Sequence, residues 1–265
     1  MVKLSKQDRW TMIEKVHLLQ LEVLLENRML SKDGAEVLTK LYRNAIPFLI
    51  LTEQTGRTRD SLVEFFHASG MTMLRPDNFY TSAMAAVDWL SYFHPDKKRA
   101  AYIGGNGIKL SLQMGGFQID YKNPDVLIVG MDRNLSYKDY SDYLQMILSG
   151  TTLMSTDNRL IQRFEGAEMI GNRAIVKMLE EASGVEAISF GRGSRLLPEM
   201  AMRYLNVSPD NILLVGNDFQ KDIVPAIDLT MFTAYITGGN SIMSLGMSDV
   251  LHPDYLLESL GGLTK

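Results

Sequence analysis

The chain alternates short, continuous apolar runs with longer amphipathic stretches. The apolar runs are too short for helices, and they predict strands at Val16–Gln20, Phe48–Thr52, Ala100–Ile103, Val126–Val129, Thr152–Ser155, Ala187–Phe190, Ile212–Val215 and Met231–Ile236. The amphipathic stretches predict helices at Gly34–Asn44, Thr58–Ser69, Ser82–Phe93, Tyr137–Ser149, Gly171–Ser183, Leu197–Leu205 and Asp222–Leu229. Strands that are apolar on both faces and alternate with helices indicate an α/β protein with a parallel sheet.

Three glycines mark the expected helix ends. Gly70, Gly150 and Gly184 each stand just after a predicted helix, where a residue in the left-handed conformation commonly ends the helix. The polar stretch His94–Arg99 separates a predicted helix from the next strand and is read as a turn.

Composition narrows the class of protein. A chain of 265 residues with 46% apolar and 22% charged residues is typical of a soluble globular protein of one large or two smaller domains. Residues 1–9 carry charges without an apolar stretch after them, and no apolar run approaches the roughly 20 residues of a membrane span. We therefore expect a cytoplasmic protein with no membrane partner. The absence of cysteine excludes disulfides and thiol catalysis, and a net charge of −4 without a basic block argues against nucleic acid as a partner.

Three segments carry a resemblance to a known family. They read Phe-Tyr-Thr-Ser-Ala-Met-Ala at 79–85, Asn-Pro-Asp-Val-Leu-Ile-Val-Gly at 123–130 and Leu-Leu-Val-Gly-Asn-Asp-Phe-Gln-Lys-Asp-Ile at 213–223. In this order and at this spacing they resemble the NagD-like, p-nitrophenylphosphatase branch of the haloacid dehalogenase-like (HAD) superfamily. The resemblance extends from about Val16 to Pro253.

The resemblance implies a fold and a division into domains. Proteins of this family have a Rossmann-like core with a parallel sheet and an inserted α/β cap. We therefore expect a core at 1–80 and 184–265 and a cap at 81–183. The active site of such sheets lies at the carboxyl ends of the strands.

The first motif of the family departs from its usual form here. The family places D-x-D-G after the first strand, with one Asp as nucleophile and one as general acid/base, whereas this chain has Gln20-Leu21-Glu22-Val23. Gly34 fixes the alignment, and no Asp occurs between Asp8 and Asp33, so a shifted alignment does not recover a nucleophile. Gln20 has an amide that cannot attack phosphorus, and Glu22 takes the acid/base position. Whether these residues keep a binding role or merely end a strand is left open.

The second and third motifs are matched in part. Thr52 fits the hydroxyl residue that hydrogen-bonds the phosphoryl group, and Arg192 stands where the family has a Lys. Arg keeps the positive charge, but its planar guanidinium group differs in shape from the compact ammonium group of Lys, so the exchange is not conservative. The alternative for Arg192 is an ordinary solvated loop residue.

Two further segments are candidates for contacting a substrate. Glu53 and Gln54 follow Thr52 directly. Thr156, Asp157 and Asn158 lie in a segment that resembles the family's T-N-P-D sequence, which faces the substrate. A plain solvent turn is the alternative for the second segment.

The fourth motif supplies metal ligands in the family. Here its first Asp is Asn217, followed by Asp218 and Asp222. Mg²⁺ prefers several hard anionic oxygens, so the exchanges at Gln20 and Asn217 predict weak Mg²⁺ binding or none. Asp222 also has a simpler explanation as an acid favoured in the first turn of a helix.

Three functions remain open from the sequence. The preferred one is a NagD-type protein without aspartyl-phosphate phosphatase activity that acts as a binding or regulatory protein. The alternative is a hydrolase of small phosphate monoesters that uses Glu22, Asp218 and Asp222. The expected ligand is a small phosphorylated metabolite, homo-oligomerisation is left open, and a purely structural role is a third hypothesis.

Overall fold

A computed structural model describes residues 15–164, 166–239 and 251–263. The N-terminal residues on which the expected cytoplasmic location rests lie outside these ranges. Every helix within the ranges is too short or too polar to cross a membrane.

The described chain forms two compact units, and it passes from one unit to the other four times along the sequence. The first unit contains the described residues up to Thr52, Asp60–Tyr80 and those from Ala201 onward. The second unit contains Glu53–Arg59 and Thr81–Met200. Each unit is built around its own sheet, so the α/β fold with a core and an inserted α/β part is confirmed.

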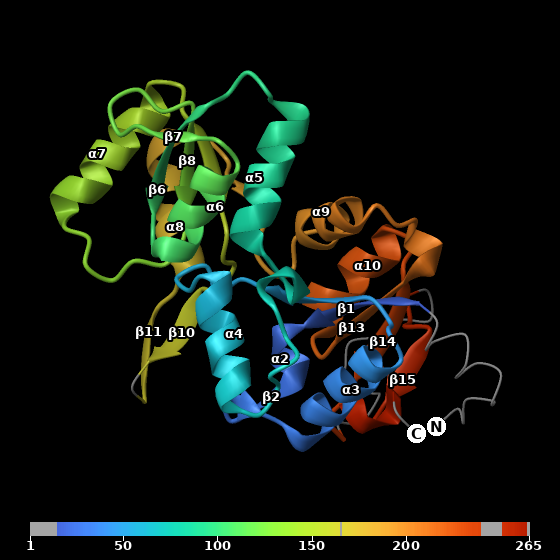
Figure 1. Ribbon diagram of the computed structural model, residues 1–265. Coiled ribbons are helices and arrows are strands. Elements are labelled where there is room, and N and C mark those ends of the chain that lie inside the picture. The colour runs from blue at the N-terminus through green and yellow to red at the C-terminus, as the bar shows by residue number, and fades with distance from the viewer. Residues whose placement is uncertain (1–14, 165, 240–250, 264–265) are drawn as a thin grey trace. The chain divides into compact units, whose positions relative to one another are not determined.

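The first unit holds a six-stranded sheet in the order β15-β14-β13-β1-β4-β5 (Figure 1). Its strands are β1 (Val16–Gln20), β4 (Phe48–Thr52), β5 (Phe79–Thr81), β13 (Ile212–Gly216), β14 (Phe232–Ile236) and β15 (Tyr255–Leu257). β1 is central and pairs in parallel with both β4 and β13, and β13, β14 and β15 continue the parallel order.

Helical segments cover both faces of this sheet. They are α2 (Leu21–Leu24), α3 (Lys32–Arg43), α4 (Arg59–Ala68), η1 (Pro76–Asn78), η2 (Pro209–Asn211), the π-helix η3 (Phe219–Ile223), α10 (Val224–Asp228) and η5 (Leu260–Leu263), while α9 (Leu196–Leu205) crosses the boundary between the units. Buried side chains of α3 share one hydrophobic cluster with Val215 and Ile236. The neighbouring Tyr235 packs instead with Phe219 and Ile223, so η3 lies against the opposite face. This alternation follows from the two-residue period of a strand.

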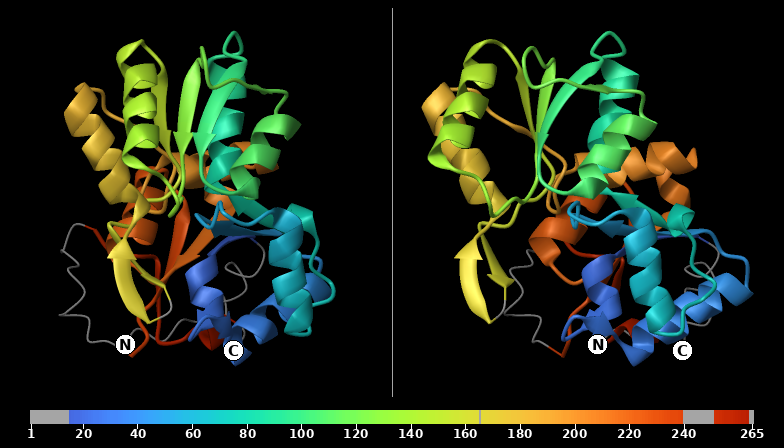
Figure 2. Two further views of the ribbon diagram at one scale, coloured as in Figure 1. Left: turned by 90° about the vertical axis from the view of Figure 1, so that its left-hand side faces the viewer. Right: turned by 60° about the vertical axis from the view of Figure 1, so that its left-hand side comes forward.

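The second unit holds a five-stranded sheet in the order β12-β9-β8-β6-β7, in which neighbouring strands pair in parallel. Its strands are β6 (Arg99–Ile103), β7 (Gln118–Ile119), β8 (Val126–Val129), β9 (Thr152–Ser155) and β12 (Ile188–Ser189). Figure 2 shows helices on both faces of the sheet, α5 (Ser82–Phe93) and α6 (Asn106–Met114) on one and α7 (Tyr137–Leu148) and α8 (Asn172–Ser183) on the other. The side chains of β8 are fully buried, as expected for a strand covered on both faces.

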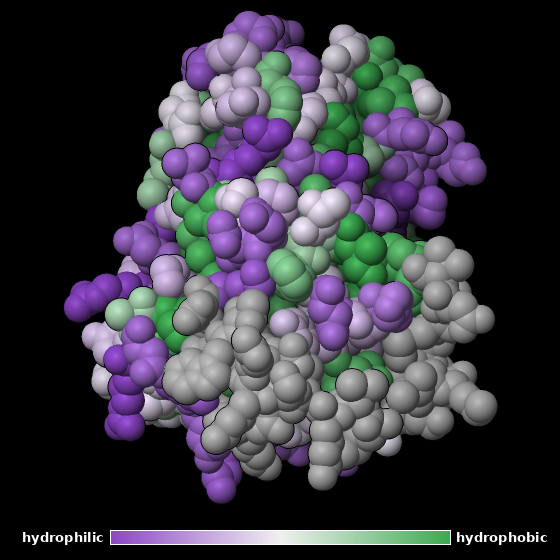
Figure 3. Space-filling view, turned by 90° about the vertical axis from the view of Figure 1, so that its right-hand side faces the viewer, coloured by the Kyte–Doolittle hydropathy of each residue, from purple (hydrophilic) through white to green (hydrophobic). Residues whose placement is uncertain are grey.

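Two small antiparallel hairpins complete the described structure. They are β2 (Leu25–Glu26) with β3 (Met29–Leu30), and β10 (Ile161–Phe164) with β11 (Ala167–Ile170). Ile161 and Ile170 face each other across the second hairpin and are more than half exposed. In the coloured part of the face drawn in Figure 3, hydrophilic residues surround several hydrophobic patches.

The predicted strands all correspond to observed ones, but one lies in a different sheet from the one expected. The strand around 187–190 was assigned to the first unit, and its observed form, β12, pairs with β9 in the second sheet. The contact division accordingly extends the second unit to Met200. The glycine predictions are confirmed, because Gly70, Gly150 and Gly184 have φ angles of 88°, 99° and 70°.

The helix α6 was not predicted, and its glycines explain both the omission and the packing. Gly105 precedes the helix and Gly107 lies in its first turn, where glycine weakens the helical signal. A Cβ atom on residue 107 would lie 2.1 Å from the carbonyl oxygen of Arg57, and one on residue 105 would lie 2.6 Å from that of Gly56. The start of α6 is therefore packed against the backbone of Glu53–Arg59, closer than any side chain would allow.

We predict that Gly107→Ala lowers the free energy of unfolding by about 1–3 kcal/mol, because the new methyl group must displace backbone atoms. Alanine would otherwise stabilise a helix by about 1 kcal/mol relative to glycine, so the expected sign is opposite to that of helix propensity. Urea denaturation measures the change in the free energy of unfolding. Gly56→Ala is the control, because a Cβ atom on residue 56 meets nothing within 4 Å. A Gly107→Ala protein as stable as the unaltered one would show that the packing is not tight.

Candidate functional site

The first candidate site lies at the carboxyl edge of the first sheet. Gln20 ends β1 and pairs in register with Leu51, so Gln20 and Thr52 are adjacent at this edge. On the other side of β1, Leu19 pairs with Val215, which brings Asn217 and its loop to the same edge. The side chains of Gln20 and Thr52 are almost completely buried, at 2% and 1% exposure. Parallel pairing thus gathers the predicted positions of the first, second and fourth motifs within the first unit.

The first motif continues into a short helix. Gln20 is the residue before α2, and Glu22 lies half-buried in its first turn. Glu22 therefore lies two residues beyond the end of the strand, inside a helical turn. Val23, which replaces the family's Gly, is buried in the main hydrophobic cluster of the unit beside Leu24 and Leu38. The position that the family leaves without a side chain serves here in core packing.

The loop after β13 is held together by one carboxylate. Asp222 is 1% exposed, and its Oδ2 accepts hydrogen bonds from the backbone N–H groups of Asn217 at 3.0 Å and Asp218 at 2.9 Å. A Cβ atom on Gly216 would lie 2.2 Å from the Asp222 Cβ, so only glycine fits before the loop. Asp222 therefore stabilises the loop through backbone hydrogen bonds, a role different from the interaction with a helix dipole that the sequence suggested as its simpler explanation.

Asp218 is also engaged locally. Its Oδ1 accepts the N–H of Lys221 at 3.1 Å, and its Oδ2 forms an ion pair with the Lys221 ammonium at 2.9 Å. Burial raises the pKa of the nearby Tyr235 phenol, and the charges of Asp218 and Asp222 raise it further. The phenol therefore stays neutral at physiological pH.

These residues do not fit a Mg²⁺ site. Mg²⁺ requires near-octahedral oxygen ligands, of which carboxylates supply the charge. One oxygen of Asp222 serves two backbone amides, Asp218 is neutralised by Lys221, and Asn217 offers at most an amide oxygen. In the part of the chain that the structure describes, no three acidic or histidine side chains are grouped as metal ligands.

The second candidate site lies at the carboxyl edge of the second sheet. Asn158 follows β9 and Arg192 follows β12, and these neighbouring strands pair in register. The Oε2 atom of Glu53 accepts the backbone N–H of Asn158 at 3.1 Å and that of Arg192 at 2.9 Å. The predicted residues Glu53, Asp157, Asn158 and Arg192 thus gather within the second unit, around a carboxylate from the segment that follows β4.

Arg159 links the two buried carboxylates, and the sequence analysis did not single it out. Its Nε lies 3.2 Å from Glu53 Oε1 and donates to Asp157 Oδ1 at 3.0 Å, and a second guanidinium nitrogen bonds Asp157 Oδ2. Glu53 is 5% exposed and Asp157 1%, so two buried acids share one arginine. A buried acid needs a nearby cation, and this rule would have pointed to Arg159 two residues after Asp157.

Burial is the main reason why the pKa of Glu53 is raised to about 7. The charge of Asp157 raises it further, whereas Arg159 and the two backbone hydrogen bonds lower it. Glu53 therefore changes its charge near neutral pH, inside a tightly bonded cluster.

The other predicted binding residues mostly hold the loops in place. The Thr156 hydroxyl lies 3.1 Å from that of Thr55 and 3.3 Å from the carbonyl of Val129. The Asn158 amide donates to the Arg192 carbonyl and accepts from the Ser189 hydroxyl. Gln54 is half-buried. The side chains of Thr156 and Asn158 thus have internal partners already.

A buried asparagine that the sequence did not reveal completes this edge. Asn172, at the start of α8, donates its amide to the carbonyls of Val129 and Asp157 and to the Ser155 hydroxyl. It is 1% exposed and ties the ends of β8 and β9 together. Only the fold, which brings α8 to this edge, could have identified it.

Comparisons with known proteins show what the chain is similar to. A model described as haloacid dehalogenase-like hydrolase matches residues 22–118, beginning two positions after Gln20. Among solved structures, NagD from Escherichia coli K-12 superposes with a TM-score of 0.84 at 22% identity, covering 93% of this chain and 97% of that chain. A double mutant of a thermostable NPPase from Geobacillus stearothermophilus gives 0.83 at 23% identity, with 93% and 96% covered.

Two characterised bacterial phosphatases are similar to this chain in sequence over most of its length. The chain is 24% identical to 5′-nucleotidase YutF of Bacillus subtilis, covering 86% of this chain and 89% of that one. It is 25% identical to an acid sugar phosphatase of Staphylococcus epidermidis, with 86% and 88% covered. The resemblance inferred from the sequence is confirmed: the chain is similar to haloacid dehalogenase-like hydrolases and, over most of its length, to NagD-like phosphatases in sequence and in fold.

We predict that the unaltered protein loses stability relative to Glu53→Gln as the pH rises from about 4.5 to about 7. The folded state holds the Glu53 proton up to a pKa of about 7, whereas the unfolded state releases it near the ordinary value of 4.5. Between these values the folded state binds more protons, so the free energy of unfolding falls with rising pH.

Melting temperatures of the two proteins across this pH range measure the effect. Glu186→Gln, at an exposed position of the same unit, controls for the loss of one carboxylate. A stability of the unaltered protein, measured relative to Glu53→Gln, that stays constant or rises across this pH range would contradict the prediction.

Proposed function

We propose that this protein lacks aspartyl-phosphate phosphatase activity and acts as a binding or regulatory protein with a phosphatase fold. The observation that carries the proposal is Gln20, buried at the end of the central strand β1 between Thr52 and the β13 loop. The family's reaction begins with a carboxylate at this position. An amide neither attacks phosphorus nor forms a phosphoenzyme.

The local use of the remaining acids supports the same proposal. Asp222 fixes the backbone of the 216–218 loop, and Asp218 is paired with Lys221. Freeing either for a metal would break contacts that shape the loop. Weak Mg²⁺ binding or none is therefore part of the proposal.

For a ligand we propose a small phosphorylated metabolite. The support is the class named by the relatives, a 5′-nucleotidase and acid sugar phosphatases, together with the buried Thr52 hydroxyl at the edge of the sheet.

The second candidate function is a residual hydrolase of phosphate monoesters. It is favoured by the phosphatase names of the relatives and by the half-buried Glu22 in the first turn of α2. In this alternative Glu22, Asp218 and Asp222 would have to supply the chemistry. The two proposals differ in whether turnover depends on Glu22.

We predict that hydrolysis of p-nitrophenyl phosphate stays at the uncatalysed rate. Enzymes typically accelerate such reactions by a factor of about 10⁶ or more, and Gln20 removes the nucleophile through which this family gains it. Release of nitrophenolate with and without Mg²⁺ measures the rate. Mg²⁺-dependent turnover that disappears in Glu22→Gln would overturn the inactive proposal in favour of the hydrolase.

Restoring the motif tests the reason for inactivity. Gln20→Asp alone is expected to stay inactive, because Asn217 still leaves the metal short of a carboxylate. The combined variant Gln20→Asp, Glu22→Asp, Val23→Gly and Asn217→Asp rebuilds nucleophile, acid/base, turn and ligand together and is the variant expected to gain turnover. Equal activity in the single and combined variants would show that the Asn217 position does not limit the site.

We predict no Mg²⁺ binding in the micromolar range, because the carboxylates of the 217–222 loop already bind backbone amides and the Lys221 ammonium. Isothermal titration calorimetry with MgCl₂ measures it. Micromolar binding that is abolished by Asp218→Ala would show that the loop rearranges into a metal site.

A further inference from the structure

The hairpin of β10 and β11 is the part of the second unit that its sheet leaves largely uncovered. Among the described residues the two strands pair only with each other, and Figure 2 shows them standing apart from the five-stranded sheet of that unit. Seven of their eight residues are exposed, and Gln162 is half-buried. A two-stranded ribbon by itself is at best marginally stable in water, so this hairpin gains stability from a surface that covers it.

The two faces of the hairpin are covered to different extents. One face carries Phe164 and Met169, which are 36% and 38% exposed, and the Arg133 guanidinium lies 3.6 Å from the centre of the Phe164 ring. The other face carries Ile161 and Ile170, which are paired in register and are 61% and 67% exposed. Because side chains alternate along a strand, the first face is turned toward the unit and the second toward solvent.

The solvent face also carries two opposite charges. Arg163 and Glu168 are paired in register two residues further along the strands, toward the turn of the hairpin. The four side chains of Ile161, Arg163, Glu168 and Ile170 together form what we call the isoleucine face. It is apolar at the base of the hairpin, charged toward the turn, and without net charge.

The isoleucine face is complementary to itself under one kind of two-fold axis. An axis that runs parallel to the strands, between two such faces, places each β10 over the β11 of a second copy. Ile161 then meets the Ile170 of the second copy, and Arg163 meets its Glu168. An axis across the strands would either place isoleucines over charges or leave the charged residues outside the contact.

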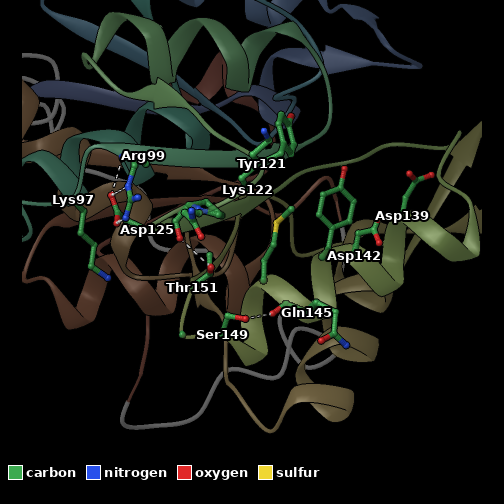
Figure 4. A pocket seen from close by; sticks show the side chains of 15 residues that line it. Lys97, Arg99, Tyr121, Lys122, Asp125, Asp139, Asp142, Gln145, Ser149 and Thr151 are labelled. Atoms are coloured by element: carbon green, nitrogen blue, oxygen red, sulfur yellow. Dashed lines mark hydrogen bonds and ion pairs between the residues drawn. The ribbon is translucent and has the colours of Figure 1, made fainter.

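A cavity at the amino edge of the five-stranded sheet is a second feature of this unit's surface (Figure 4), and its volume is about 720 Å³. Its lining carries three basic and three acidic side chains, which are Lys97, Arg99, Lys122, Asp125, Asp139 and Asp142. Arg99 pairs with Asp125, and Asp142 pairs with Lys138. This lining favours neither sign of charge and offers no apolar face, so the isoleucine face is the stronger candidate for a contact.

We propose that the protein forms a weak homodimer through the isoleucine face, with two hairpins packed face to face about a two-fold axis parallel to their strands. The contact of four isoleucines supplies the affinity, and the four charges set the orientation. Two such faces bury less than the roughly 800 Å² per partner of a standard interface, so the dimer dissociates in the micromolar range. The contact involves no residue of either carboxyl edge, so it does not depend on the proposed function.

Sedimentation velocity of the full chain from about 5 to about 500 µM measures the association, and the fraction of dimer is expected to rise across this range. Ile170→Gln should weaken the association at least about tenfold, because each dimer loses two apolar contacts. Met114→Gln is the matched control, since Met114 is 73% exposed on α6 outside the hairpin and should leave the association unchanged. Circular dichroism confirms that each variant is folded.

Charge reversal tests the orientation of the two hairpins. Arg163→Glu alone and Glu168→Arg alone should each weaken self-association about tenfold, since like charges then meet across the contact. An equimolar mixture of the two variants should dimerise about as tightly as the unaltered protein, because each glutamate of one variant then faces an arginine of the other. The like charges within each hairpin persist in the mixture, so rescue identifies a contact between two copies.

Three results would overturn the proposal. One is a protein that stays monomeric up to about 500 µM, which would leave the isoleucine face to a different partner. Another is a dimer that Ile170→Gln does not weaken, which would place the contact elsewhere on the chain. The third is a mixture of the two charge variants that associates no better than either variant alone. Phosphatase assays do not enter this test, so its failure is distinguishable from failure of the proposed function.

Discussion

Parallel pairing of β1 with β4 and β13 is the constraint on which the first unit depends. Because β1 is hydrogen-bonded on both sides, the ends of the three strands lie at one edge, and Gln20, Thr52 and the 216–218 loop have no freedom to separate. This geometry is what the family uses to assemble a nucleophile, a hydroxyl and metal ligands. The assembly persists here although the groups at two of the positions have changed, since strand pairing involves only backbone atoms.

The acids of both edges are used to hold backbone in place. Asp222 accepts two amides of the loop after β13, and Glu53 accepts two amides of the loops after β9 and β12. A carboxylate with two or three such bonds is well satisfied, and withdrawing it would leave buried N–H groups unpaired at a cost of about 1–3 kcal/mol each. Counting acidic residues at a strand end therefore overstates the ligands available to a metal.

The sequence was sufficient for the regular parts of the fold and for the positions of the first unit. Val16–Gln20 and Phe48–Thr52 are apolar runs buried on both faces, and their observed bounds agree with the prediction. The helix α6 was missed because Gly105 and Gly107 weaken the helical signal. Their place in the helix depends on close contact with the backbone of Glu53–Arg59, and local helix propensity does not reveal such a contact. The assignment of β12 to the wrong sheet has the same origin, since a short strand does not specify its partner.

The residues of the second unit were harder to interpret for a related reason. Thr156, Asp157 and Asn158 were recognised as a motif, but a motif does not show which side chains already have internal partners. Arg159 and Asn172 became visible only when β9, β12 and α8 were brought to one edge.

Val23 shows how packing and chemistry are coupled at the first motif. The family's glycine leaves the turn after the nucleophile without a side chain, whereas Val23 is 8% exposed and packs in the core of the unit. Removing a buried valine side chain costs about 1–3 kcal/mol through lost contacts and a residual cavity. A turn shaped for catalysis would therefore come at the expense of stability in this chain, and the geometry that positions Gln20 is held by the same hydrophobic contacts that fill the core beneath it.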